Sequence, residues 1–143
     1  MCIIFTKTFV MTIFSKIING EIPAYKIAES DKFIAFLDIE PLVTGHVLVV
    51  PKVEVNKIFD VPDDYLAAML VFAKPVAHAI EKIFDCKRCG ISVIGLEVPH
   101  AHMHLVPINS ADDLNFTRTK LNPAQEELKA VYEKLKAALI LID

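Results

Sequence analysis

Three histidines alternate with two apolar residues in the run His100-Ala101-His102-Met103-His104. This alternation predicts a β-strand, because successive side chains of a strand point to opposite faces. We expect the strand to span 100–107, with the three imidazoles on one surface and the apolar residues between them facing a core. The chain holds only five histidines in 143 residues, so chance is a poor explanation for such a grouping. Any fold of this chain must therefore set three imidazoles side by side on a sheet.

The rest of the chain adds strands and helices in a regular order. Short apolar runs bounded by turn residues predict four further strands, at 25–29, 33–38, 46–50 and 90–94. Helical spacing predicts a short helix at 13–18 and a long one at 62–84. Strands joined by short loops, with the helices set apart, favour an α+β fold. We expect an antiparallel five-stranded sheet with one long helix and a C-terminal helix.

The C-terminal helix has its own start signal. Asn122 can cap it, Pro123 suits the first helical position, and Gln125 stands where a capping box needs it. The opposite end of the chain is less clear. Residues 1–11 are expected to be a poorly ordered extension, or a start placed upstream of Met11. Residues 12–143 would then form one domain.

Composition limits the possible partners. The net charge is −3 with no basic cluster, so a nucleic-acid polymer is not expected. Apolar stretches reach only about nine residues, as in 65–73, whereas a membrane span needs about 18. The N-terminal residues lack the basic start and the sustained apolar run of a secretory signal, so we expect a cytoplasmic protein. Hydrophobic residues make up 54% of the chain, which suggests that some apolar surface is buried against a partner.

The histidine run allows three kinds of chemistry. Two histidines two apart on a strand can share a zinc ion, although a third consecutive ligand would strain the geometry. Neutral imidazole can instead attack phosphorus without first losing a proton, while a neighbouring imidazolium neutralises a phosphate oxygen or donates to the leaving group. Three solvent-exposed histidines without a function are the third possibility. The pair Cys86 and Cys89 has the spacing of half a zinc site or a redox motif, but no second pair accompanies it.

Four blocks of the sequence, in order, resemble the histidine triad (HIT) family. The triad pattern alternates histidine with apolar residues, and the run from His100 to Val106 matches it. The chain looks like the nucleoside phosphoramidase-like, or HINT-type, branch, and the similarity spans about 12–108. The blocks are 13–24 (IFSKIINGEIPA), 36–41 (FLDIEP), 44–52 (TGHVLVVPK) and 100–106 (HAHMHLV).

The resemblance implies a role for each matching residue. His102 would be the nucleophile that carries the nucleotide, and His104 would contact the phosphate oxygens. His100 and His46 would support the site. Asp38 would bind the ribose hydroxyls, although an aspartate at this place could equally cap a turn. The further residues placed at the nucleotide are mostly apolar, and each could equally be plain core: Ile13, Phe14, Ile17, Phe36, Ile39, Leu48, Glu97 and Val98.

Two departures from the family pattern stand out. Many relatives carry a zinc site made of two cysteines in the opening block and a histidine after Pro-Lys, where this chain has Thr12, Ser15 and Glu54. We therefore expect no metal and no cofactor, and an opening helix held by packing alone. Leu96 and Glu97 stand where phosphoramidase-type relatives often have Gln and Ser, which predicts weak assistance to poor leaving groups.

The reaction implied is hydrolysis or transfer at the α-phosphate of a nucleotide through a nucleotidyl-histidine. The expected substrate is a purine nucleotide or a nucleoside 5′-phosphoramidate. Hydrolysis of dinucleoside polyphosphates, or nucleotide binding with residual activity, are the alternatives. A homodimer joined edge to edge would hide the exposed sheet edge and the surplus apolar surface.

Overall fold

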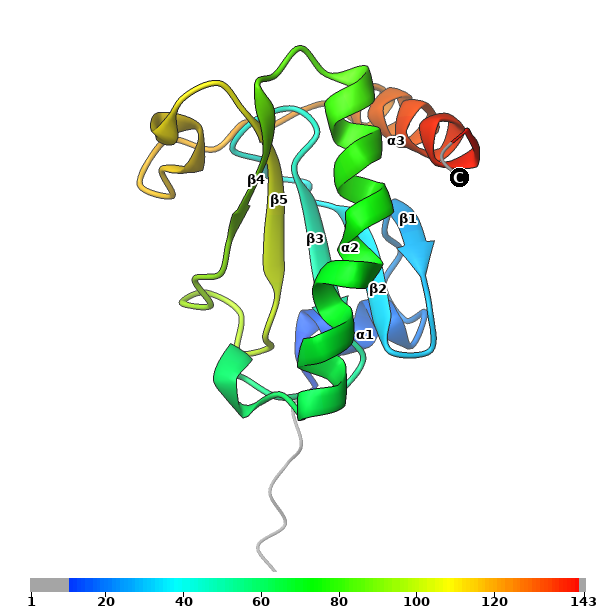
Figure 1. The fold of residues 1–143 in the computed structure, drawn as a ribbon, viewed down its shortest axis with the longest axis vertical. Coiled ribbons are helices and arrows are strands. Elements are labelled where there is room, and N and C mark those ends of the chain that lie inside the picture. The colour runs from blue at the N-terminus through cyan, green and yellow to red at the C-terminus, as the bar shows by residue number, and fades with distance from the viewer. Residues whose placement is uncertain (1–10, 142–143) are drawn as a thin grey trace, which may run out of the picture.

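The computed structural model describes residues 11–141, which form one sheet and three α-helices (Figure 1). The predictions for residues 1–10 fall outside this range. The helices are α1 (Ile13–Ile18), α2 (Asp63–Ile83) and α3 (Gln125–Ile140), with short 3-10 helices η1 (Ile58–Asp60) and η2 (Ala111–Leu114). The strands are β1 (Lys26–Glu29), β2 (Phe33–Leu37), β3 (Val47–Pro51), β4 (Arg88–Ser92) and β5 (Met103–Ile108). Within 11–141 no helix is both long and apolar enough to span a bilayer.

The five strands form one sheet in the order β1-β2-β3-β5-β4. All four neighbouring pairs are antiparallel, which confirms the predicted α+β class and the antiparallel five-stranded sheet. In the register, Leu48 of β3 lies opposite both Phe36 of β2 and His104 of β5. Residues opposite each other in an antiparallel pair share one face, so these three side chains lie on the same side of the sheet.

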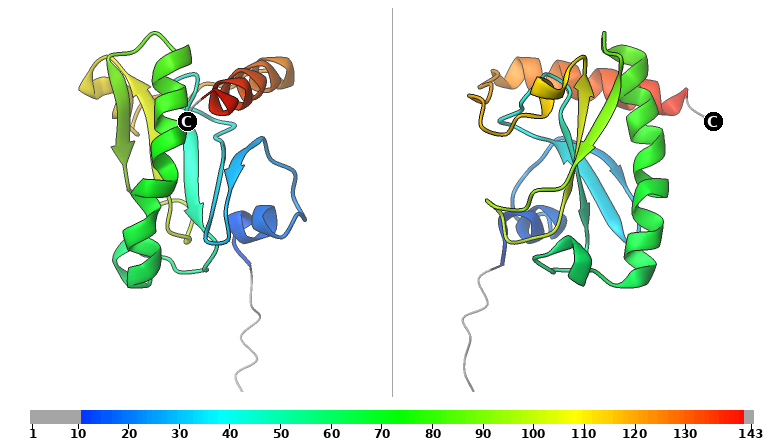
Figure 2. Two further views of the ribbon diagram at one scale, coloured as in Figure 1. Left: turned by 45° about the vertical axis from the view of Figure 1, so that its right-hand side comes forward. Right: turned by 60° about the vertical axis from the view of Figure 1, so that its left-hand side comes forward.

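The two faces of the sheet bury different helices. The larger core lies between the sheet and helices α2 and α3, with Val76 and Ile80 of α2 fully buried against Val49 and Leu105. The smaller core packs Phe14 of α1 against the opposite face. Figure 2 (right) shows α1 and α2 on opposite sides of the sheet. Because His104 shares the face of Leu48, the histidines lie on the α1 side, away from the main core.

Three expected boundaries are wrong. Strand β4 spans Arg88–Ser92 rather than the expected 90–94, because its pairing with β5 starts at Arg88. The histidine strand begins at Met103 rather than His100, so two of the three histidines precede it. Before the strand, the N–H of Ala101 donates to the carbonyl of Val55 at 2.7 Å. The last helix begins at Gln125 with Ala124 at its N-cap and no side-chain cap, so Asn122 does not start it. Capping patterns indicate a helix but not its first residue.

Candidate functional site

The three histidines of the run are buried, so the possibility that they are solvent-exposed histidines without a function does not hold. Their exposed fractions are 0% for His100, 5% for His102 and 7% for His104. The rings of His102 and His104 pack edge to face with centroids 4.8 Å apart. Burial follows from the covering elements, because Phe14 of α1 lies 4.9 Å from His102 and Phe116 lies 4.6 Å from His104. Only the rims of these two rings reach solvent.

A backbone contact fixes which ring nitrogen of His102 carries the proton. Its Nδ1 lies 2.7 Å from the carbonyl oxygen of His100, which can only accept a hydrogen bond. Nδ1 therefore carries the ring proton. Burial lowers the pKa of His102 below its ordinary value of 6.5, so the ring is neutral at pH 7 and Nε2 keeps its lone pair. The result is a neutral imidazole with an unprotonated Nε2, the form that can act as a nucleophile.

His104 has the opposite tautomer, set by a chain of donors. The backbone N–H of Leu42 donates to Nδ1 of His46 at 3.1 Å, so the proton of neutral His46 lies on Nε2. That N–H donates to Nδ1 of His104 at 2.8 Å, which leaves the proton of His104 on Nε2. Burial lowers the pKa of both rings to about 3, so both are neutral at pH 7. His104 can therefore offer a hydrogen-bond donor beside the lone pair of His102.

Asp38 lies at the end of β2, next to this chain of histidines. One carboxylate oxygen accepts the N–H of Glu40 at 2.9 Å, which is the turn cap expected as one possibility. The other lies 3.6 Å from Nε2 of His46, too long for a strong hydrogen bond. Burial raises the pKa of Asp38 to about 6, with the Glu40 N–H opposing the shift. The carboxylate thus stays ionised at pH 7 but is close to its titration range.

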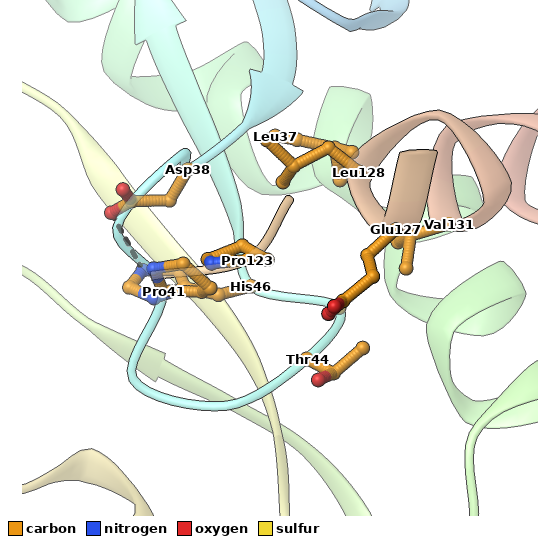
Figure 3. Close-up of a pocket in the computed structure, with 10 residues that line it drawn as sticks. Leu37, Asp38, Pro41, Thr44, His46, Pro123, Glu127, Leu128 and Val131 are labelled. Carbon is orange, nitrogen blue, oxygen red and sulfur yellow. Dashed lines mark ion pairs between the residues drawn. The ribbon is translucent and has the colours of Figure 1, made fainter. Parts of the chain in front are cut away.

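Figure 3 shows Asp38 and His46 joined by the dashed ion-pair line, with the helix that carries Glu127 and Val131 beside them. The small cavity here, of about 20 Å³, is lined by Glu127 and Val131 of α3 among others. It has room for about one water and cannot hold a nucleotide. This side of Asp38 and His46 is therefore packing, in which the start of α3 supports the loop that carries them.

A second cavity, of about 460 Å³, opens on the other side of the histidines. His102 and His104 form part of its wall with Asp38, which brings together residues that lie far apart in the sequence. Of the eight other residues expected at a nucleotide, five line this cavity. Ile13, Phe14 and Ile39 line the cavity, together with Glu97 and Val98. Its remaining lining comes from Glu40, Ile94, Gly95, Leu96, Phe116, Thr117 and Lys120.

The other apolar residues expected at the nucleotide lie beneath the cavity. Phe36 and Leu48 are buried in the smaller core, and Ile17 packs against it from α1. Phe36 contacts Phe14 edge to face at 5.6 Å between ring centroids. These residues therefore support Phe14, which is the ring that faces the cavity. His100 also stays behind the wall, because it does not line the cavity.

Sequence reasoning missed the segment after β5. Phe116 packs edge to face on His104, and Thr117 and Lys120 complete the cavity on the same side. The segment is tied to the Asp38 loop, because the N–H of Leu121 donates to the carbonyl of Pro41 at 2.9 Å. A lone aromatic residue and a lone lysine in a loop carry no periodic signal. Only the three-dimensional fold brings them to the site.

His100 is held by a polar cluster. Its Nε2–H donates to the carbonyl of Pro51 at 2.8 Å, so Nδ1 accepts the hydroxyl of Thr12 at 2.9 Å. One carboxylate oxygen of Glu54 accepts the N–H of Thr12 at 2.9 Å and the hydroxyl of Ser15 at 2.7 Å. These two donors, the backbone N–H first, hold the pKa of Glu54 below its usual range. The expectation that α1 rests on packing alone is wrong, because these hydrogen bonds tie its first turn to His100.

Possible metal ligands gather at one place within residues 11–141. Atoms of Asp38, His46 and His104 lie within 4.8 Å of one another. The nitrogens concerned already bond each other, so a metal ion would have to displace the contact between His46 and His104. Cys86 and Cys89 do not join this set. Burial raises the pKa of the Cys89 thiol to about 12, which argues against a reactive or metal-binding thiolate.

Comparison with known proteins agrees with this geometry. The model of the HIT domain matches residues 19–111. The chain belongs to the HIT family. The HIT domain is 38% identical over 125 residues to an uncharacterized HIT-like protein of Borreliella burgdorferi, covering 82% of this chain and 90% of that one. It is 32% identical to adenosine 5′-monophosphoramidase HNT1 of Candida albicans, covering 92% and 93%. These relatives confirm the resemblance to the HINT-type branch.

Solved structures share the fold. The crystal structure of a zinc-bound histidine triad family protein from Mycobacterium smegmatis superimposes with a TM-score of 0.76 at 30% identity. The match covers 90% of this chain and 93% of that one. The α+β architecture expected from the sequence is therefore that of the HIT domain.

Proposed function

We propose that this HIT domain hydrolyses nucleotides at the α-phosphorus, with His102 as the nucleophile. The observation that carries the proposal is the pair of opposite tautomers on one cavity wall. The carbonyl of His100 leaves the lone pair of His102 on Nε2, and His46 leaves a proton on Nε2 of His104. A lone pair beside an N–H donor suits a phosphate, which must be attacked at phosphorus while its oxygens are stabilised.

The reaction would proceed in two steps. Nε2 of His102 forms a bond to phosphorus as the bond to the leaving group breaks, while the Nε2–H of His104 contacts a phosphate oxygen. The modified His102 ring is then cationic, and its Nδ1–H still donates to the carbonyl of His100, 2.7 Å away. In the second step the oxygen of a water bonds to phosphorus as the bond from Nε2 of His102 to phosphorus breaks, which restores neutral His102, and the water's proton passes to solvent. No metal is needed for either step.

Nucleoside 5′-phosphoramidates are the first substrates to test. The support comes from the relatives named adenosine 5′-monophosphoramidase, one of which matches nearly the whole chain. Ile13, Phe14 and Ile39 would contact a purine base at the apolar end of the cavity, and Asp38 would accept hydrogen bonds from the ribose. An amine must gain a proton as it leaves. Neutral His104 and His46 hold no proton to spare at pH 7, so we expect water to supply it.

The deciding experiment supplies adenosine 5′-monophosphoramidate and measures AMP and ammonia together. We expect equal amounts of both from the wild-type protein and none from His102→Ala. A dinucleoside polyphosphate tested in parallel addresses the alternative hydrolase activity. Binding of AMP without turnover of either substrate would contradict the proposal and favour a nucleotide-binding protein.

We also infer that the chain forms a homodimer through β4. This strand is an edge of the sheet, and Ile91, Val93 and Ile94 expose apolar side chains on and just beyond it. The other edge, β1, has α3 packed beside it. An exposed apolar edge strand is a ready surface for pairing with a second copy. Light scattering should show a dimer that Ile91→Lys weakens, and a wild-type monomer at the same concentration would contradict the inference.

A further inference from the structure

An ion pair lies among the residues that line the cavity beside His102 and His104. Nζ of Lys120 lies 3.0 Å from one carboxylate oxygen of Glu97 and 3.3 Å from the other. The two residues come from segments that lie 23 residues apart in the sequence. Glu97 belongs to the loop before His100, and Lys120 to the segment after β5. The Glu97 side chain is 78% exposed and that of Lys120 27%, so the cation is the better shielded partner.

Lys120 is placed near the reacting groups. It lines the same cavity as His102 and His104, in the segment whose Phe116 packs on His104. Its charge acts on the neighbouring rings, since it adds to burial in lowering the pKa of both His46 and His104. Among the residues that line the cavity, the other charged groups are the carboxylates of Asp38, Glu40 and Glu97. Lys120 is therefore the one fixed cation of the cavity lining in the described part of the chain.

The site is better equipped for one kind of leaving group than for the other. An amine must take up a proton when it leaves, and the buried histidines are neutral at pH 7. Leu96, on the rim, has no proton to give. A phosphate or carboxylate leaves as an anion and needs no proton, but its developing charge needs a cation. Lys120 can meet that need.

We propose that Lys120 binds an oxyanion leaving group of the nucleotide, that Glu97 competes for it, and that the pair sets how fast phosphoanhydrides and acyl adenylates react relative to phosphoramidates. This rests on the proposed attack by His102. Nε2 of His102 forms the bond to the α-phosphorus, and the bond from that phosphorus to the bridging oxygen breaks. The electron pair stays on the bridging oxygen. The group leaves as an anion facing the Lys120 ammonium, which keeps all its protons.

A purely structural role makes a different prediction. If the ion pair only held its two segments together, Lys120→Met and Glu97→Gln would both break it and would change kcat/KM for every substrate in the same direction. If Lys120 binds the leaving group, the two substitutions act in opposite directions. Removing the cation weakens catalysis on anionic leaving groups, and removing its competitor strengthens it.

Three substrates with one adenylyl group test this. ADP releases phosphate, acetyl adenylate releases a carboxylate, and adenosine 5′-monophosphoramidate releases ammonia. Each variant is compared with wild type on each substrate by kcat/KM. We expect Lys120→Met to lower the ADP value about tenfold, as for loss of one charge-assisted contact, and the phosphoramidate value less than about twofold. We expect Glu97→Gln to raise the ADP value a few fold. Lys26→Met, which breaks the exposed pair of Lys26 with Glu29, is the matched control and should change nothing.

The outcomes separate cleanly. An effect on ADP alone assigns the subsite to phosphate, and an effect on ADP and acetyl adenylate assigns it to oxyanions in general. Equal changes on all three substrates, or changes of the same sign in both variants, would overturn the subsite. If wild type turns over none of the three, the proposed function fails. Calorimetry with AMP and α,β-methylene ADP then still tests the subsite. We expect the wild-type protein to bind α,β-methylene ADP more tightly than AMP, and Lys120→Met to lose this difference in affinity. Equal affinities in the wild-type protein, or an unchanged difference in Lys120→Met, would contradict the subsite.

Discussion

The two ends of the histidine run are built from the same side chain and differ in what surrounds it. At the His100 end both ring nitrogens have protein partners, Thr12 and Pro51, and the ring does not reach the cavity. At the His104 end one nitrogen has a protein partner, His46, and the ring lines the cavity. Between them, His102 has one nitrogen bonded and one free. Chemistry is therefore available only where a ring nitrogen lacks a protein partner.

Replacing the middle histidine should have the largest effect. We expect His102→Ala to lower kcat at least about a thousandfold, because the nucleophile is removed. Nucleotide affinity and the midpoint of thermal unfolding should change little. His78→Ala, on the exposed face of α2, is the matched control and should behave as wild type. Retention of wild-type turnover by His102→Ala would contradict the assignment of the nucleophile.

The His104 end is broken most directly at His46. His46→Ala removes the donor that fixes the tautomer of His104, and we expect kcat to fall about a hundredfold with a smaller change in KM, as for loss of one preorganised donor. His46→Gln keeps an amide N–H and should recover part of the loss. If KM rose while kcat stayed unchanged, His46 would serve binding rather than the orientation of His104.

The His100 end should respond in stability rather than in turnover. Thr12→Val removes the hydroxyl that caps α1 and donates to His100. We expect the free energy of unfolding to fall by about 1–2 kcal/mol, and kcat to change by less than about threefold. Denaturant unfolding and steady-state kinetics on the same sample check both halves. A large loss of kcat in a stably folded Thr12→Val would show that this end also serves the chemistry.

A further effect concerns pH and Asp38. The folded pKa of about 6 lies above the ordinary 3.8, so the folded protein binds this proton more tightly than the unfolded chain. Its contribution to stability is present below pH 3.8 and is lost as pH rises through 6. Asp38→Asn lacks this loss and should gain stability relative to wild type by about 3 kcal/mol between pH 4 and 7.

Measuring Asp38→Asn and wild type over the same pH series separates Asp38 from the other titrating groups. His46 and His104 have folded pKa values of about 3, so their contribution is present above pH 6.5 and is lost as pH falls toward 3. Both histidines remain in Asp38→Asn, so the difference between variant and wild type isolates the carboxylate. A difference that does not change with pH would contradict the raised pKa.

The sequence predicted the sheet well because its pattern is local. Continuous apolar runs bounded by turn residues predicted the buried strands β2 and β3 to within one residue at each end. The strand start at Met103 could not be predicted, because the same alternation continues through His100 and His102 without a partner strand. Burial of the histidines was also missed, since it depends on Phe14 and Phe116 closing over them from distant segments.

The site was predicted where short motifs carry it and missed where side chains meet by tertiary contact. The cluster of Thr12, Ser15 and Glu54 illustrates the second case. The sequence showed only that these residues stand where many relatives have metal ligands. In the fold they form hydrogen bonds that reach His100. Lys120 is a similar case, because no local pattern connects it with Glu97, which lies 23 residues earlier.

The tautomers of the histidines can be measured directly. Ring nitrogens labelled with ¹⁵N and correlated with the carbon-bound ring protons by NMR at pH 7 distinguish a protonated nitrogen from an unprotonated one. We expect the proton on Nδ1 of His102 and on Nε2 of both His46 and His104, with all three rings neutral. His102→Ala and His104→Ala assign the signals. A proton on Nε2 of His102, whether in the other neutral tautomer or in an imidazolium, would remove the nucleophile and contradict the proposed mechanism.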